Sequence, residues 1–347
     1  MEAIFTIFSK QYKFEIRPKN TKDKSNNEQN NSIDIIKNNI LYKANLINIS
    51  KYTNTDKSLI SSLKESCIIR KYNIYEKEFE NTKYILIIME RAKLKDLRKF
   101  VERFHRKDRK MFNIINMPFH RNMGDNLMRF FSKQIIRCME LLDRKKLVHF
   151  EIKPENFLIN NSLKIALSEF KFLTKINKNN NDVFEKPDFI HGYITPELIK
   201  KSKDKKENNI TGEMAKKNDY FSLGATLYFM KFGEQRIEYN DNNLGNDTII
   251  DLIQNDLIYL NSRKSVNVKF INFLNNLIKY KLEDIPSFEK IYRNEWLYEN
   301  QEEINNLTNT YRPEEEDKLI LEFMKSDFLV EKKNKSKKKR NFIFEED

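Results

Sequence analysis

The stretch from Val148 to Asn156 constrains this chain more than any other part of the sequence. Its residues, Val-His-Phe-Glu-Ile-Lys-Pro-Glu-Asn, form a polar segment followed directly by the short apolar run Phe157-Leu158-Ile159. A second apolar run, Leu163-Lys164-Ile165-Ala166-Leu167, ends just before Glu169. Short apolar runs that are separated by polar residues are typical of buried strands joined by loops. The sequence therefore predicts a polar loop and a carboxylate at the ends of neighbouring strands.

The polar residues of these segments are of the kinds that bind metals and phosphates. Glu151, Lys153 and Asn156 come from the loop, and Glu169 follows Glu151 by eighteen residues. Carboxylate and amide oxygens bind Mg²⁺, and an ammonium group binds phosphate. A charged surface hairpin with no function is the alternative interpretation, because runs of charge are usually solvated. Residue types alone do not separate these two interpretations.

The order of the residues favours a functional site. The loop resembles the catalytic loop of protein kinases, which has His-Arg-Asp, four further residues and Asn. His149 and Asn156 stand in the His and Asn places, and Lys153 to Asn156 matches the Ser/Thr-type loop. Glu169-Phe170-Lys171 stands where that family has Asp-Phe-Gly.

Two later motifs extend the resemblance. Gly192 to Glu197 is similar to the end of the activation segment, and Asp219 to Gly224 is similar to the start of the buried helix after it. In that family, Asp219 would bond to the backbone of the catalytic loop. Four motifs in this order imply an α+β, two-lobed protein-kinase-like fold. Its N-terminal lobe would be small and mostly β with one helix, and its C-terminal lobe larger and mostly α.

The resemblance divides the chain into three parts. Residues 1–89 are expected to form a divergent N-lobe, residues 90–300 the C-lobe, and residues 301–347 a charged tail with helical and basic segments. Residues 17–32 are rich in Lys, Asn, Asp and Ser, which predicts a flexible insert. The resemblance is good over residues 84–300 and poor over the first 80.

Local patterns predict the elements of the N-lobe. Apolar and polar residues alternate in residues 1–16, which predicts one or two strands. Residues 33–49 predict a hairpin around Asn38-Asn39. Residues 58–72 have apolar residues at helical spacing, and the fully apolar run 85–89 predicts a central strand.

The residues that hold phosphate in a kinase N-lobe are absent or ambiguous. No glycine precedes Gly124, so the glycine-rich loop that covers the ATP phosphates is absent. Either Lys43 or Asn45 occupies the place of the strand-three lysine, because a short apolar run does not fix strand register. Glu65 is the candidate for the glutamate that pairs with this lysine, and Ser61 or Ser62 are the competing occupants of its position.

ATP and Mg²⁺ are the cofactors that the resemblance implies. Met89-Glu90-Arg91-Ala92 follows the apolar strand and resembles the hinge whose backbone meets adenine. Lys171 replaces the glycine of Asp-Phe-Gly, and its ammonium would either lie near the phosphates or, by slight preference, point into solvent. The expected cofactor-binding residues are Lys43, Met89, Glu90, Ala92 and Lys171, and the expected metal ligands are Asn156 and Glu169.

Several substitutions weaken the expected chemistry. Glu151 and Glu169 replace aspartates, and each extra methylene moves a carboxylate by over ~1 Å, which can cost about a hundredfold in rate. Phe150 replaces the arginine that pairs with a phosphorylated activation segment. A pseudokinase acting as a scaffold or regulatory binding module is therefore the first hypothesis. The alternative is a weak Ser/Thr kinase with Glu151 as base, Lys153 on the γ-phosphate, and Asn156 and Glu169 on Mg²⁺.

Composition bounds the partners and the compartment. The net charge is +13 and is spread along the chain, which a coding bias toward Asn and Lys would also produce. A protein partner with an acidic surface, such as a filament, is expected, and the basic cluster 106–110 is its candidate site; no nucleic-acid ligand is expected. No apolar run is long enough to span a membrane, and no secretory signal is evident. Two isolated cysteines indicate a reducing, intracellular compartment, cytoplasmic or cytoskeletal, with the nucleus as the alternative.

Overall fold

A computed structural model describes most of the chain up to residue 299. The described ranges are 2–16, 32–49, 57–92, 94–102, 123, 125–160, 163–176, 183–185, 193–203, 209–233 and 266–299. Residues 1–297 form one compact unit and residues 298–347 a second. The predicted flexible insert (apart from Ser32), the basic cluster 106–110 and the tail 301–347 lie outside the described residues.

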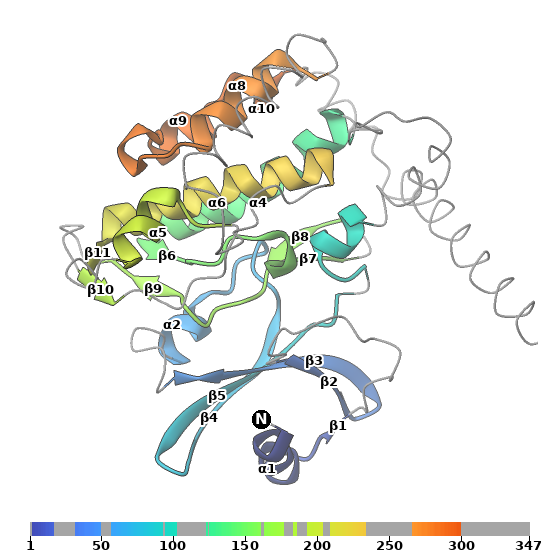
Figure 1. Cartoon of the computed structure of the whole chain (residues 1–347). Coiled ribbons are helices and arrows are strands. Elements are labelled where there is room, and N and C mark those ends of the chain that lie inside the picture. The colour runs from blue at the N-terminus through green and yellow to red at the C-terminus, as the bar shows by residue number, and fades with distance from the viewer. Residues whose placement is uncertain are drawn as a thin grey trace, which may run out of the picture. The chain divides into compact units, whose positions relative to one another are not determined.

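A five-stranded antiparallel sheet forms the N-terminal part, in the order β1-β2-β3-β5-β4 (Figure 1). The apolar run of β5 lies between β3 and β4, and its residues 85–89 are all buried, which confirms the predicted central strand. The strands are β1 (Glu15–Ile16), β2 (Ser32–Lys37), β3 (Ile40–Asn48), β4 (Lys71–Phe79) and β5 (Thr82–Met89).

The turn between β2 and β3 has the predicted position. Asn38 and Asn39 both have positive φ, 52° and 61°. Two consecutive left-handed residues are what a type I′ hairpin turn requires, and Asn tolerates this conformation better than most residues. The hairpin predicted for residues 33–49 is confirmed.

The prediction of a strand at the N-terminus is wrong for most of that segment. Residues Glu2–Tyr12 form helix α1, and only Glu15–Ile16 is a strand. Ile4, Phe5 and Phe8 are spaced for one face of a helix and are buried against Leu46, Leu86 and other apolar residues of the sheet. In so short a segment, apolar residues that are spaced for one face of a helix also resemble the alternation of a strand. The segment is helical because the helix buries these residues against the sheet.

The predicted helix over residues 58–72 is much shorter than expected. Helix α2 (Lys57–Ser62) ends before Leu63. After it the chain turns at residues 65–67 and then bridges to another strand: Ile69 N–H donates to the Leu167 carbonyl, and Leu167 N–H donates to the Cys67 carbonyl, each at 2.9 Å. This pairing supplies hydrogen bonds to the backbone and buries the apolar side chains that follow α2. The helix therefore does not continue.

Helices make up most of the remaining described residues. The long helix α4 (Asp125–Arg144) confirms the amphipathic helix predicted around residues 127–142. Helix α6 begins at Gly212, and not at Asp219 as predicted, because Thr211 caps it by accepting a hydrogen bond from Met214 N–H. Further helices are α5 (Pro196–Lys203), α8 (Val268–Leu277), α9 (Phe288–Tyr292), α10 (Glu295–Tyr298) and the 3₁₀ helices η2 (Pro154–Asn156) and η3 (Leu282–Asp284), and residues 97–102 are also helical.

Three two-stranded antiparallel sheets accompany these helices, and one of them positions the candidate site. The loop from His149 to Asn156 runs from β6 to β7, and the pairing of β7 with β8 brings the residues after β8 back to that loop. The strands are β6 (Leu147–Val148), β7 (Phe157–Ile159), β8 (Ile165–Leu167), β9 (Thr174–Lys175), β10 (Val183–Glu185) and β11 (Asn209–Thr211). Among the described helices, none has the length and apolar character that crossing a membrane requires.

Candidate active site

The backbone of the loop is anchored from helix α6 by Asp219. The Asp219 carboxylate accepts hydrogen bonds from His149 N–H at 2.7 Å and Phe150 N–H at 2.9 Å. Phe150 has a φ of 63°, so these two bonds hold a left-handed residue in place. Burial raises the pKa of Asp219 to about 7, against the two backbone bonds, which lower it. The role that the kinase resemblance implied for Asp219 is confirmed.

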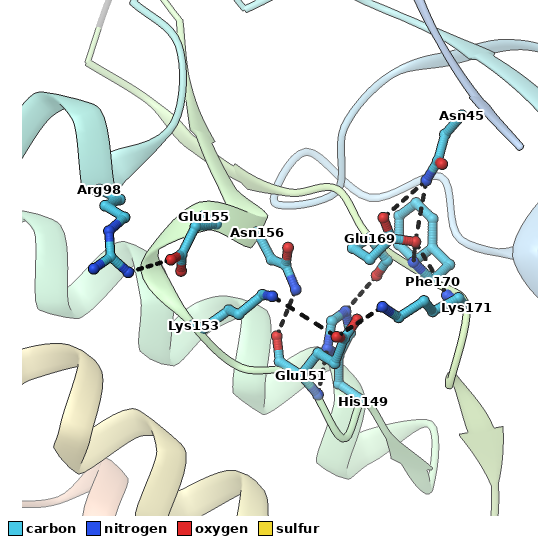
Figure 2. Close-up of polar contacts among 10 residues, drawn as sticks. All are labelled: Asn45, Arg98, His149, Glu151, Lys153, Glu155, Asn156, Glu169, Phe170 and Lys171. Carbon is cyan, nitrogen blue, oxygen red and sulfur yellow. Dashed lines mark hydrogen bonds and ion pairs between the residues drawn. The ribbon is translucent and has the colours of Figure 1, made fainter. Parts of the chain in front are cut away.

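His149 joins the loop to the residue after β8 (Figure 2). Its Nε2 bonds to the backbone carbonyl of Glu169, and its Nδ1 accepts from Glu151 N–H at 3.3 Å. This arrangement assigns the proton of a neutral imidazole to Nε2. Burial lowers the pKa of His149 to about 4, with the nearby cations Lys153 and Lys171 adding to the effect. His149 is therefore a neutral structural link.

Asn156 closes the loop on itself. Its Nδ2 donates to the backbone carbonyl of Glu151 at 2.8 Å. Its own carbonyl accepts from both the N–H and the hydroxyl of Ser168, each at 3.0 Å. The loop and the strand end that carries Glu169 are thus held together by short bonds between main chain and side chains.

Glu151 is buried between two lysines. Its Oε1 lies 3.0 Å from Lys171 Nζ and 3.8 Å from Lys153 Nζ. Burial raises the pKa of Glu151, the two lysines lower it, and the charge of Glu169 raises it further. The slight preference for Lys171 in solvent is therefore wrong, because its side chain turns inward to Glu151 (Figure 2). The electrostatic attraction of a buried carboxylate explains this direction.

Glu169 is occupied by donors from two parts of the chain. Asn45 Nδ2 donates to Oε1 and Oε2 at 3.0 and 2.9 Å. The backbone N–H groups of Phe170 and Lys171 also donate to Oε1, at 3.0 and 3.3 Å. Asn45 is itself buried, with 3% exposure, in β3. Of the two candidates for the strand-three lysine position, Asn45 is therefore the one that contacts Glu169.

Lys43 is paired with Asp34 and not with Glu169, and its expected contact with cofactor phosphates stays a prediction. Its Nζ is 3.6 Å from Asp34 of β2, and Asp34 is also 3.4 Å from Arg91 Nε in the segment after β5. Lys43 and Asn45 point to the same side of β3 two residues apart, and only Asn45 is near enough to Glu169. The sequence alone could not decide between Lys43 and Asn45, because it does not fix the register of the strand.

None of the candidate partners of the strand-three residue contacts Asn45 in the described hydrogen bonds and ion pairs. Glu65 lies beyond the end of α2 and pairs with Lys145 at 2.8 Å. Ser61 and Ser62 donate to the carbonyls of their own helix, those of Lys57 and Leu59. The ion pair that joins helix and strand in an active kinase thus has no equivalent among these residues.

The hinge candidates follow β5 as expected. Met89 is its last residue and is buried. Glu90 N–H donates to the Arg70 carbonyl at 2.8 Å, and the Ala92 carbonyl accepts from Lys95 N–H at 3.3 Å. Some of the backbone groups of this segment are therefore already engaged within the protein.

The side chains as arranged do not fit ATP with Mg²⁺. Oε1 of Glu169 already accepts three hydrogen bonds, and Asn45 supplies no positive charge for phosphate. Lys171 and Lys153 are directed to Glu151. Within the described part of the chain, no three His, Cys, Asp or Glu residues gather as a metal site. Binding would require Glu169 to exchange these donors for the cation.

Comparison with known proteins agrees with the arrangement of these motifs. The model of the protein kinase domain family matches residues 23–297. The chain is 24% identical to the serine/threonine-protein kinase atg1 of Dictyostelium discoideum, over 72% of this chain and 32% of that protein. It is 28% identical to the Rho-associated protein kinase let-502 of Caenorhabditis briggsae, over 35% of this chain and 10% of that protein.

A third relative matches a shorter segment more closely. The serine/threonine-protein kinase cds1 of Schizosaccharomyces pombe is 34% identical over 28% of this chain and 20% of that protein. The chain thus matches a third or less of the length of each of these relatives. The match to the family model agrees with the five-stranded sheet and with the loop that Asp219 anchors. The chain belongs to the protein kinase domain family.

Proposed function

We propose that this chain is a pseudokinase, a kinase fold that serves as a scaffold or regulatory binding module with phosphotransfer impaired or absent. The bond between Asn45 and Glu169 is the main support. Kinases use a lysine and an acidic residue here, one for the phosphates and one for Mg²⁺. In this chain a neutral amide stands in place of the cation and donates hydrogen bonds to the carboxylate.

The ion pair between Glu151 and Lys171 supports the same proposal. A catalytic carboxylate must be within hydrogen-bond reach of the substrate hydroxyl. Glu151 is 5% exposed, and its Oε1 is directed to Lys171 at 3.0 Å. Releasing it for a substrate would leave a buried charge with a weaker partner, which is costly. The longer side chains of Glu151 and Glu169 add to this cost by displacing both carboxylates.

A weakly active Ser/Thr kinase is the second candidate. It is favoured by the convergence of Glu151, Lys153, Asn156 and Glu169 on one loop and one strand end. In that case Glu151 would act as base and Lys153 would bind the γ-phosphate, with Asn156 and Glu169 on the metal. The same residues are present in both proposals, so only measurement of nucleotide binding and transfer separates them.

Two assays on the full chain test the proposal. Thermal unfolding with ATP, with and without Mg²⁺ or Mn²⁺, should give no shift, whereas a ligand at 100 times its Kd would stabilise by about 2.7 kcal/mol. Transfer of phosphate to a general protein substrate should equal that of the Glu151→Ala and Glu169→Ala variants. Transfer that both variants abolish would contradict the pseudokinase role and support the second candidate.

The partner and the compartment remain parts of the proposal. A net charge of +13 supports a partner with an acidic surface, such as a filament. The free thiols of Cys67 and Cys138 support a reducing, intracellular location, in the cytoplasm or on the cytoskeleton, with the nucleus as the alternative. Co-sedimentation with an acidic filament that is lost at high salt, and lost on neutralising Arg106, Lys107, Arg109 and Lys110, tests the partner.

A further inference from the structure

The protein has a cavity of about 620 Å³. It is bordered by the segment between α2 and β4, the start of β4, the hinge residues Glu90 and Ala92, and the β7–β8 hairpin. None of Asn45, Glu151 and Glu169 lines it. The cavity therefore shares only the hinge residues with the candidate active site, and the rest of its lining has no role in the expected kinase chemistry.

The lining of the cavity combines apolar and positively charged side chains. Apolar side chains from four segments contribute, among them Leu63, Ile69, Ile74, Leu158 and Ile165. A cavity of this volume, lined by both apolar and charged side chains, has the size of a ligand-binding site.

The charged side chains of the lining are mainly cations. They are Lys57, Lys64, Arg70, Lys71 and Lys164, against the two carboxylates of Glu65 and Glu90. Glu65 is already paired with Lys145 at 2.8 Å. Among the described residues, no carboxylate lies within ion-pair distance of Lys57, Lys64, Arg70 or Lys164.

Lys71 shows the cost of this charge without an anion. Its Nζ bonds to the Leu63 carbonyl and lies 5.2 Å from the centre of the Phe170 ring. Burial lowers the pKa of Lys71 to about 8. The attraction of Glu65 opposes this effect only in part, and an anionic occupant would offset the burial cost of Lys71 further.

The backbone beside the cavity favours an extended occupant. β4 is the edge strand of the sheet, and Lys71 to Ile74 at its start line the cavity. In the part of the chain that the structure describes, no strand pairs with the outer side of β4 (Figure 1). Alternate N–H and C=O groups of an edge strand face outward and can accept an added strand.

We propose that this cavity binds an extended acidic peptide of a partner protein, one that alternates carboxylates with apolar side chains. The apolar residues fill the cavity, the carboxylates meet the surrounding lysines and arginine, and the backbone extends beside β4. The proposal rests on the scaffold role proposed above, because it names the class of partner and the surface that receives it.

Fluorescence anisotropy on the full chain tests the proposal. The probe is a labelled peptide of about ten residues, the upper length of an ordinary strand, in which Glu and Leu alternate. The control peptide has Lys at every Glu. Saturable binding of the Glu peptide, weakening as salt is raised, is expected, with no saturation for the Lys peptide.

Three variants locate the binding. Lys164→Glu should weaken binding by about fivefold or more, the factor for about 1 kcal/mol, and Ala166→Phe should abolish it by filling the cavity from β8. Lys290→Glu makes the same charge change on an exposed residue of α9 and should leave binding unchanged. Equal binding by the three variants, equal binding of both peptides, or competition by free ATP or inorganic phosphate would overturn the proposal.

Failure here is distinguishable from failure of the pseudokinase role. The same protein samples are assayed for phosphate transfer, and Lys164→Glu lies outside the residues assigned to that site. Transfer without peptide binding removes the cavity proposal together with the scaffold interpretation. Absence of both removes the cavity proposal alone, because a scaffold can use another surface.

Discussion

The side chain of Asn45 donates to both carboxylate oxygens of Glu169, at 3.0 and 2.9 Å, although the two residues are 124 positions apart in the chain. The bond joins the sheet to the strand end beside the catalytic-type loop. It replaces a contact that would hold a cation and a metal ligand in an active kinase. The chemistry proposed for this protein depends more on this pair than on either glutamate substitution alone.

Asn45→Lys should restore some nucleotide binding. The new ammonium would supply the missing positive charge for phosphate at the place that now holds an amide. ATP with Mg²⁺ should then raise Tm by about 2–4 °C, which corresponds to roughly 1 kcal/mol of binding. Asn45→Met, which has similar length and no charge, is the control and should show no shift. A wild-type shift as large as that of Asn45→Lys would contradict the prediction.

Glu151 and Lys171 should be coupled energetically. Glu151→Gln leaves Lys171 without its carboxylate, so each single variant removes the same attraction. A cycle of Glu151→Gln, Lys171→Met and the double variant, followed by urea unfolding, should give a coupling of about 1–3 kcal/mol.

The control for this cycle is an exposed pair. Glu289 and Arg293 are 3.0 Å apart on the surface, with side chains 68% and 75% exposed. The same cycle on this pair should give only about 0.3–0.5 kcal/mol, because water screens it. Equal coupling in the two pairs would show that burial adds nothing to the contact between Glu151 and Lys171.

Asp219→Asn should destabilise the fold by about 2–4 kcal/mol. His149 N–H and Phe150 N–H bond to different oxygens of the carboxylate, and an amide replaces one of these oxygens by an NH₂ group, which would face a donor. Chemical denaturation measures the loss. Asp284→Asn, at an exposed position, is the control and should change stability by no more than about 0.5 kcal/mol. If Asp219→Asn left the stability unchanged, the left-handed Phe150 would need no anchor.

His149 should make stability fall on acidification. Its folded pKa, about 4, is below the ordinary value of 6.5, so protons bind the unfolded chain more tightly. The contribution of His149 is fully present above pH 6.5 and is lost as the pH falls through about 4. The full loss is on the order of 3 kcal/mol.

The comparison with His149→Gln isolates this contribution. Glutamine keeps a donor for the Glu169 carbonyl and does not titrate. Unfolding free energies of the two proteins, measured from pH 7 to pH 4, should converge as the pH falls. Asp219, with its pKa raised to about 7, acts in the opposite direction, losing stability as the pH rises through that value, and it is present in both proteins. Parallel curves would refute the role of His149.

Local patterns in the sequence predicted the elements whose own residues specify them. The turn at Asn38-Asn39 needs two left-handed residues, and α4 has apolar residues throughout a helical face. The end of α6 follows from Gly233, whose φ is 70°. The boundaries of α1, α2 and α6 were missed because burial against other segments, or a cap at Thr211, decided them.

The sequence by itself determined the family, the order of the motifs and the replacement of both catalytic aspartates by glutamate, because these depend on residue identity along the chain. Only the tertiary structure decided that Asn45, and not Lys43, meets Glu169, and that Lys171 turns inward to Glu151. The physical reason is that both choices depend on which side chain comes within reach of a buried carboxylate. That distance is fixed by the packing of the sheet on the loop, over more than a hundred residues of chain.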